Sequence, residues 1–175
     1  KTVNEIKTLY EIEYIEGYLN DKMLNYIKYC QTKKKRFIIF PLYILWPDSS
    51  SAHANMLIFD NVKKTCERFE PYGNDGWSKT PKKVKMEWLV EEAFDSVFED
   101  FLIELDKKKK IKFKYLRPMD YCPAKAYQFY NDFYGKHHSE DPAGYCAIWS
   151  IWWAELRLTY PDKSQESLIK ICINV

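Results

Sequence analysis

Cys146 follows the segment DPAG and opens a run of apolar residues that extends to Leu158. Proline and glycine are poor residues for a helix interior, whereas the run after them suits a helix, so we expect Cys146 in the first turn of a helix. The unpaired backbone N–H groups of that turn favour a thiolate, lower the pKa of the thiol and can bind a developing oxyanion. Free cysteine is also a common core residue, so position alone leaves that interpretation open.

A nucleophilic cysteine needs a base, and the chain contains three histidines. His137 and His138 lie in a polar segment that is typical of solvated surface, and we expect no metal site there. His53 instead starts the segment HANMLIFD, directly after a serine-rich stretch. A strand that begins at this point would hold the imidazole at a rigid edge, so His53 is the preferred base.

The third group is an acid that orients the imidazole, and Asp60, Glu67 and Glu70 are the candidates. If the segments HANMLIFD and TCERFE pair as a hairpin, the end of the second strand returns beside the start of the first. This pairing places Glu70 next to His53, whereas Glu67 alternates to the opposite face. Glu70 is therefore the predicted acid.

The elements that must position these groups follow from hydrophobic spacing, β-branched residues and turn residues. Strands are expected over residues 36–47, 53–60, 65–70 and 111–116. Helices are expected over 1–35, 84–105 and 144–159, a last helix or strand over 163–175, and an irregular or weakly helical segment over 122–140. This order predicts an α+β fold with helices packed on a short, mostly antiparallel sheet.

The helix expected over residues 144–159 is apolar on almost every side, which is typical of a helix in the middle of a fold. We therefore predict that it is central and buried, and that it carries Cys146. The core residues expected on its faces are Ile148, Trp149, Ile151, Trp152 and Trp153.

Length and composition limit the class of protein. The 175 residues suit one domain, with an N-terminal helical extension over about 1–35 and a core over about 36–160. Five cysteines without a C-x-x-C pair, and no signal sequence, favour a reducing compartment, either cytoplasm or nucleus, over a disulfide scaffold or a zinc ribbon. No apolar stretch is long and uncharged enough to span a membrane, and no cofactor is expected.

Two parts of the sequence resemble a known clan. HANMLIFDNVKKTCERFEPYG resembles the His-to-acid segment of adenovirus-type endopeptidases, and the spacing from His53 to Glu70 also matches Ulp/SENP-like peptidases of ubiquitin-like proteins. YCPAKAYQF and DPAGYCAIWSIWW are similar to segments of hypothetical proteins of giant DNA viruses. The resemblance covers about residues 36–160 and implies a papain-like fold of the adenain/Ulp type.

The resemblance also implies a role for each matching residue. Cys146 would be the nucleophile, His53 the general base and later the acid, and Glu70 the group that orients His53. Gln128 would donate its amide to the oxyanion, although it lies further before the cysteine than in the clan. In the clan an aromatic residue follows the histidine, whereas this chain has Ala54 at that position. The candidates for the substrate channel are Trp46, Trp77, Ala54, Gly144 and Tyr145.

The function implied by the resemblance is a thiol isopeptidase that removes ubiquitin or a ubiquitin-like protein after Gly-Gly, in the host cell if the protein is viral or an effector. The alternatives from the same order of residues are an endopeptidase acting on a Gly-Gly-containing viral polyprotein and an effector-type Ser, Thr or Lys acetyltransferase. A non-catalytic alternative is nucleic-acid binding through the basic runs at 33–36 and 107–110. Nucleic acid is the less favoured partner, because such short runs are typical of solvated helix ends.

Overall fold

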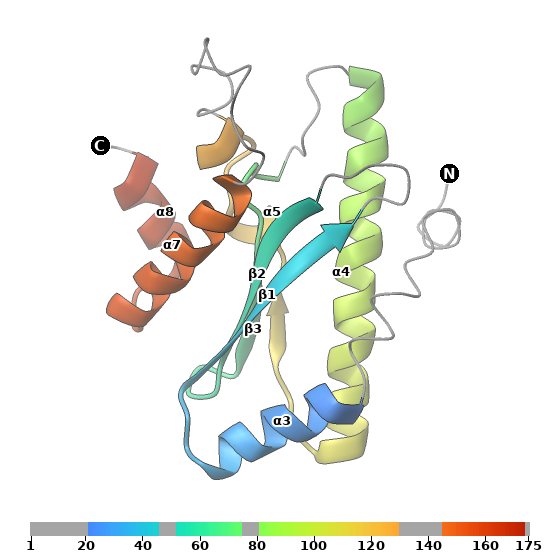
Figure 1. Ribbon diagram of the computed structural model, residues 1–175, viewed down its shortest axis with the longest axis vertical. Coiled ribbons are helices and arrows are strands. Elements are labelled where there is room, and N and C mark those ends of the chain that lie inside the picture. Colours follow the sequence, from blue (N-terminus) through green and yellow to red (C-terminus); the bar gives the residue numbers. More distant parts are fainter. Residues whose placement is uncertain (1–20, 46–51, 75–80, 130–144, 174–175) are drawn as a thin grey trace. The chain divides into compact units, whose positions relative to one another are not determined.

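The computed structural model describes residues 21–45, 52–74, 81–129 and 145–173 (Figure 1). The chain forms two compact units, each made of three stretches of sequence. Unit 1 comprises Lys1–Ile38, Phe59–Cys66 and Ser78–Tyr115. Unit 2 comprises Ile39–Ile58, Glu67–Trp77 and Leu116–Val175.

The fold is α+β, and its described strands form one four-stranded sheet in the order β1-β2-β3-β4. The strands are β1 (Phe37–Leu45), β2 (Ala52–Asp60), β3 (Thr65–Phe69) and β4 (Lys114–Leu116). The predicted hairpin is confirmed, since a four-residue turn joins β2 to β3. Asp60 Oδ1 closes this turn by accepting hydrogen bonds from the N–H groups of Val62, at 2.8 Å, and Lys63, at 3.1 Å. The fourth strand is shorter than predicted.

Unit 1 packs two helices against each other, α3 (Asp21–Thr32) and α4 (Pro81–Lys109). Figure 1 shows α3 beside the C-terminal end of α4. The buried residues of α3 recur every three residues, as a single apolar face requires: Leu24, Ile27 and Cys30. The described core of α4 follows helical spacing in the same way, with Ala93, Phe94, Val97, Phe98, Phe101, Leu102 and Leu105. No helix among the described residues is both long and apolar enough to cross a membrane.

Unit 2 contains the helices α5 (Pro118–Tyr121), α7 (Tyr145–Thr159) and α8 (Gln165–Ile173). Its core centres on Trp153, which is fully buried. The indole stacks on Phe69 of β3, with ring centroids 4.8 Å apart, and on Tyr121 of α5, at 5.8 Å. These contacts join α7 to the hairpin and to α5.

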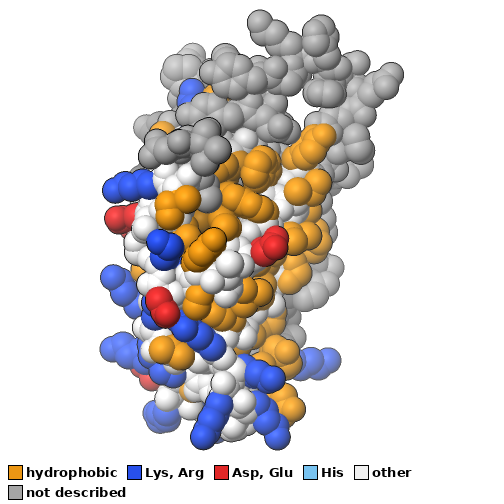
Figure 2. Space-filling view, turned by 90° about the vertical axis from the view of Figure 1, so that its left-hand side faces the viewer, with side chains coloured by type: hydrophobic (Ala, Val, Ile, Leu, Met, Phe, Trp, Pro, Cys, Tyr) orange, Lys and Arg blue, Asp and Glu red, His pale blue; other side chains and the backbone are white. Residues whose placement is uncertain are grey.

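The prediction that α7 is buried on every side is wrong. Ile148 and Ile151 are 59% and 63% exposed, and Leu158 is 52% exposed. Figure 2 shows hydrophobic side chains gathered on the face of the molecule that carries α7. The helix buries only the face that meets the strands, and this face consists of Cys146, Ser150, Trp153, Ala154 and Arg157. Arg157 is buried and two isoleucines are exposed, so the type of side chain alone does not predict which face of α7 is buried.

Candidate thiolate site

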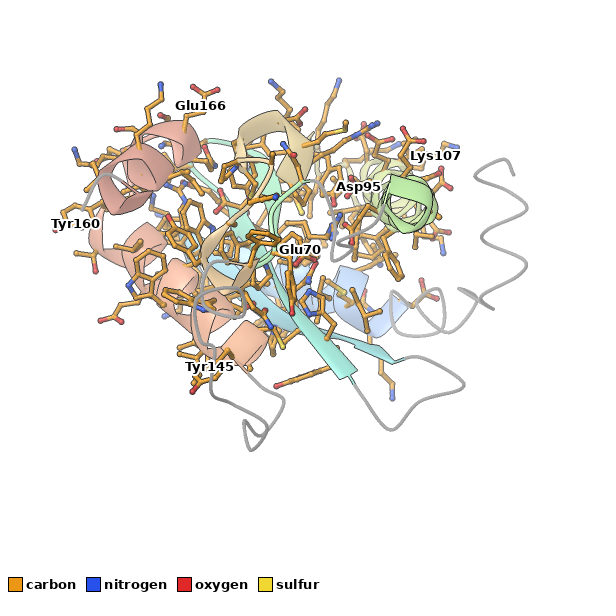
Figure 3. The ribbon with its side chains drawn as sticks, turned by 90° about the horizontal axis from the view of Figure 1, so that it is seen from above. Glu70, Asp95, Lys107, Tyr145, Tyr160 and Glu166 are labelled. Carbon is orange, nitrogen blue, oxygen red and sulfur yellow. The ribbon has the colours of Figure 1, made fainter. Side chains whose placement is uncertain are left out.

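The β2–β3 hairpin brings His53 and Glu70 into contact inside unit 2. His53 Nε2 lies 2.7 Å from Glu70 Oε1, and the two residues are 5% and 0% exposed. Since a carboxylate only accepts hydrogen bonds, Nε2 carries the proton of this contact. The backbone N–H of Tyr72 donates to the same carboxylate oxygen at 2.9 Å. Figure 3 shows Glu70 at the centre of the view, among the strands.

A buried polar chain continues behind the carboxylate. Asn55 Nδ2 donates to Glu70 Oε2 at 2.9 Å, and Arg68 Nη1 donates to Asn55 Oδ1 at 2.7 Å. Both residues are at most 1% exposed. Sequence reasoning missed Asn55 and Arg68, although the two-residue period of a strand puts them on the same face as His53 and Glu70. Asn55 and Arg68 thus fix Oε2 of the carboxylate, while His53 and the Tyr72 N–H hold Oε1.

Cys146 lies in the first turn of α7, 6% exposed, and forms a hydrogen bond with His53. Because Nε2 is bound to Glu70, the ring offers Nδ1 to the sulfur. Burial alone would raise the pKa of the Cys146 thiol, but the hydrogen bond from His53 and the backbone N–H groups of Ala54 and Ala147 outweigh it and hold the pKa below its ordinary value. These contacts therefore stabilise the thiolate of Cys146 relative to that of an ordinary cysteine.

The charges of the other two groups follow from the same contacts. Burial would lower the pKa of His53, but the Glu70 carboxylate and Cys146 raise it to about 10. Burial would raise the pKa of Glu70, but His53 and Arg68 lower it below its ordinary value. These shifts favour the imidazolium of His53, the carboxylate of Glu70 and, more than in an ordinary cysteine, the thiolate of Cys146. Thiolates paired with an imidazolium are the nucleophilic form of cysteine.

Gln128 lies in a helical segment over residues 127–129 and is 7% exposed. Its backbone N–H donates to the carbonyl of Pro71 at 3.2 Å, which ties this segment to the turn that follows Glu70. Its side-chain Oε1 is buried and, among the described residues, has no hydrogen-bond partner. The structure shows no hydrogen bond from Gln128 to Cys146 in the part of the chain that it describes, so the oxyanion role stays a prediction.

The structure describes two of the five candidates for the substrate channel, Ala54 and Tyr145. Ala54 is buried in β2, where its N–H is directed at Cys146 and its carbonyl accepts a hydrogen bond from Ser150 Oγ at 3.3 Å. Tyr145 is half-buried at the start of α7 (Figure 3). Trp46, Trp77 and Gly144 lie outside the described residues.

Glu67, the alternative acid, faces away from His53 and belongs to a separate buried cluster. Its Oε1 accepts hydrogen bonds from Trp153 Nε1 and Arg157 Nε, both at 3.0 Å, and its Oε2 accepts one from Gln165. Glu67 is 1% exposed and Arg157 is fully buried. This cluster joins β3 to α7 and α8, so Glu67 is a structural residue.

The ion pair at the site predicts a pH-dependent stability in the Cys146→Ala variant. The pKa of His53 is raised from 6.5 to about 10, so its pairing with Glu70 stabilises the fold fully below 6.5 and is lost as the pH rises toward the folded value. That folded value is lower in the variant, because the sulfur no longer contributes. We expect the midpoint of urea denaturation to fall above pH 6.5.

The matched control is the double variant His53→Gln/Cys146→Ala, which should lack this fall because glutamine does not titrate. The midpoint is measured by tryptophan fluorescence at a series of pH values. An identical profile in the single and double variants would contradict a charged His53–Glu70 pair.

Comparison with known proteins bears on what this site is for. No family model matches the sequence, and no solved structure matches it significantly. A protein of Acanthamoeba polyphaga mimivirus that is named an ankyrin repeat protein is 31% identical over 172 residues. The match covers 97% of this chain and 21% of that protein, so the chain spans about a fifth of the relative's length.

This similarity overturns the resemblance to adenovirus-type and Ulp/SENP-like peptidases, because the relative is named an ankyrin repeat protein and not a peptidase. The predicted isopeptidase activity, its endopeptidase and acetyltransferase alternatives and the classification as an enzyme are corrected with it. The physical reason is that a cysteine, a histidine and an acid in contact activate a thiol, whereas the use made of that thiol depends on the rest of the site.

Proposed function

We propose that this chain is a protein-binding module that presents Cys146 as a reactive thiolate to the partner it binds. The observation that carries the proposal is the placement of His53 between Glu70 and Cys146 in the interior of unit 2. A histidine placed there only to fill the core would not need a carboxylate with both oxygens fixed.

The binding role is supported by the similarity to an ankyrin repeat protein, because repeat proteins of this kind use extended surfaces to bind partners. Ankyrin repeats recur about every 33 residues as a turn and two helices. The described elements of this chain are instead a four-stranded sheet with helices. We therefore infer a separate module with its own site rather than a stretch of repeats.

The partner we propose is the C-terminal tail of ubiquitin or of a ubiquitin-like protein, which is narrow enough to reach a buried sulfur. The papain-like arrangement of the elements stays a prediction. The compartment that suits the proposal is the cytoplasm or nucleus, since no disulfide joins the described cysteines Cys30, Cys66, Cys122 and Cys146.

Ubiquitin and ubiquitin-like proteins that carry a C-terminal vinyl ester test the proposal. The thiolate adds to the alkene, so that an S–C bond forms, the C=C π bond breaks, and the resulting carbanion takes the proton of the imidazolium. We expect one covalent adduct, detected by mass spectrometry, that is lost in Cys146→Ala and retained in Cys66→Ala and Cys122→Ala.

The partner and the thiolate are separated by a second measurement. A small vinyl ester without a protein attached should also modify Cys146 faster than Cys122, because burial raises the pKa of the Cys122 thiol. If the small vinyl ester modifies Cys146 but the vinyl esters of ubiquitin and ubiquitin-like proteins do not, the proposed partner is wrong. Equal rates at Cys146 and Cys122 would contradict the reactive thiolate itself.

A further inference from the structure

Unit 1 carries a strongly basic surface that the thiolate site does not use. Its described segments 22–36, 61–66 and 107–115 contain lysines and Arg36 but no aspartate or glutamate. Beside Lys22 and Lys28 of α3, the exposed lysines of these segments are Lys33, Lys34, Lys35, Lys63, Lys64, Lys107, Lys108, Lys110, Lys112 and Lys114, of which Lys108 forms ion pairs with Glu104 at 2.9 Å and Asp21 at 3.2 Å. We call this set the basic surface. Figure 2 shows Lys and Arg side chains gathered toward the lower end of the view.

Backbone and side-chain contacts bring the three segments together. Asn61 of the β2–β3 turn donates from its backbone N–H to the carbonyl of Arg36 at 2.7 Å and from Nδ2 to that of Lys35 at 2.7 Å. The backbone N–H of Lys114 donates to the carbonyl of Lys64 at 2.8 Å. The lysines that follow α3, those of the turn and those that follow α4 therefore lie at one end of unit 1.

Three of these lysines occupy backbone positions that rarely take a lysine. Lys34, Lys64 and Lys110 have φ angles of 54°, 56° and 58°, and they are the non-glycine residues with positive φ in the described part of the chain. Lys34 and Lys110 follow the C-termini of α3 and α4, where glycine is the usual residue at positive φ. Because a side chain at positive φ costs backbone energy, three lysines at such positions suggest a use for their charge.

Exposed tyrosines lie beside these cations on α3. Tyr26 and Tyr29 are 51% and 56% exposed, with ring centroids 6.5 Å apart, and Lys33 Nζ lies 5.6 Å from the centroid of Tyr29. Lys22, Tyr26, Tyr29 and Lys33 follow each other at helical spacing along one face. Cations that neutralise phosphates next to aromatic rings that stack on bases are the elements of a single-strand binding surface.

We propose that the basic surface of unit 1 binds single-stranded nucleic acid. The lysines contact phosphates, and Tyr29 stacks on an unpaired base. An anionic membrane fits this surface less well, because the apolar residues of α3 are buried against the rest of unit 1 and are not available to enter a bilayer. The surface is independent of Cys146, so it can be tested whether or not the thiolate has a partner.

Fluorescence anisotropy with a labelled oligothymidylate tests the proposal. The triple variant Lys34→Asn/Lys64→Asn/Lys110→Asn removes three charges, and asparagine tolerates positive φ. We expect its affinity at low salt to fall by about tenfold or more. The slope of log K against log salt should become shallower by about 2, because each of the three lost phosphate contacts contributes about 0.7 to the slope. Its melting temperature should not fall, since backbone strain is relieved. The matched control is Lys170→Asn in unit 2, which should bind as the unaltered chain does.

Tyr29→Leu separates a single strand from other polyanions. It should weaken oligothymidylate binding by about tenfold, because one stacked base is lost, and leave the salt slope unchanged. Three outcomes would overturn the proposal: equal oligothymidylate affinity in the triple variant and the unaltered chain, no effect of Tyr29→Leu, or tighter binding to phosphatidylserine vesicles than to the oligonucleotide.

Discussion

Replacing His53 with alanine is expected to slow the alkylation of Cys146 by iodoacetamide at about pH 6.5 by at least about tenfold, since each pKa unit changes the thiolate fraction tenfold at such a pH. The thiolate displaces iodide, so the rate follows the fraction of Cys146 that is ionised. His53 supplies the side-chain hydrogen bond and the positive charge that lower the pKa of this thiol. Without them, burial and the two backbone N–H groups act alone.

The measurement is the rate of modification of each cysteine peptide by mass spectrometry under native conditions. Cys122 is the internal control, because its thiol is 4% exposed and its pKa is raised by burial. Its slow rate should be the same with and without His53, which also shows that the variant is folded. A Cys146 rate that is unchanged in His53→Ala would sink the assignment of an activated thiolate.

The largest effect on stability is expected from Glu67→Ala, which should lower the free energy of unfolding by about 3–5 kcal/mol. The substitution leaves the guanidinium of Arg157 buried, fully shielded from water and without its carboxylate. It also removes the acceptor of the Trp153 indole N–H and of the Gln165 amide. Urea denaturation measures the loss.

Two comparisons show whether the loss comes from the buried charge. Glu166→Ala removes an exposed carboxylate in the first turn of α8 and should change the free energy of unfolding by no more than about 0.5 kcal/mol. Glu67→Leu/Arg157→Leu removes both charges, so it should recover part of the stability lost in Glu67→Ala. A loss below about 1 kcal/mol in Glu67→Ala would mean that Arg157 finds other partners.

Most of the elements could be predicted from the sequence, because hydrophobic spacing and turn residues are local signals. The hairpin and the helix after DPAG follow from such signals. The short helix Pro118–Tyr121 could not be predicted, since four residues contain too little periodic pattern. The length of α4 was underestimated by residues 81–83 and 106–109, because the residues Pro-Lys-Lys and Asp-Lys-Lys-Lys at its two ends add nothing to the apolar periodicity.

The contact between His53 and Glu70 could be predicted because strand alternation and a hairpin return decide which residues are neighbours. The same reasoning extends to Asn55 and Arg68, which were missed because a buried arginine reads as a surface residue until its partner is known. The side of α7 that is buried could not be predicted. Tryptophans and isoleucines are spread around the helix, and only tertiary contacts select the face that packs.

The function was the part of the sequence interpretation that failed. The segment from His53 to Glu70 predicts that the thiol of Cys146 is activated. The sequence interpretation went further and predicted peptide cleavage by that thiol. The similarity to a protein that is named an ankyrin repeat protein contradicts that further prediction, and binding to a partner is what we propose instead. Thiol activation depends on a few contacts within reach of one hairpin, whereas the reaction depends on surfaces that those contacts do not describe.

The hairpin also affects the order in which the parts of the site form during folding. The hydrogen bonds among His53, Asn55, Arg68 and Glu70 join residues 13 to 17 positions apart, whereas those from α7 to the hairpin span 86 to 96 positions. Contacts of short sequence separation form with less loss of chain entropy, so the charged half of the site can assemble before the sulfur arrives. Detachment of α7 then leaves the His53–Glu70 pair intact but ends the activation of Cys146. The reactivity of one thiol therefore reports whether the last long-range contacts of unit 2 are closed.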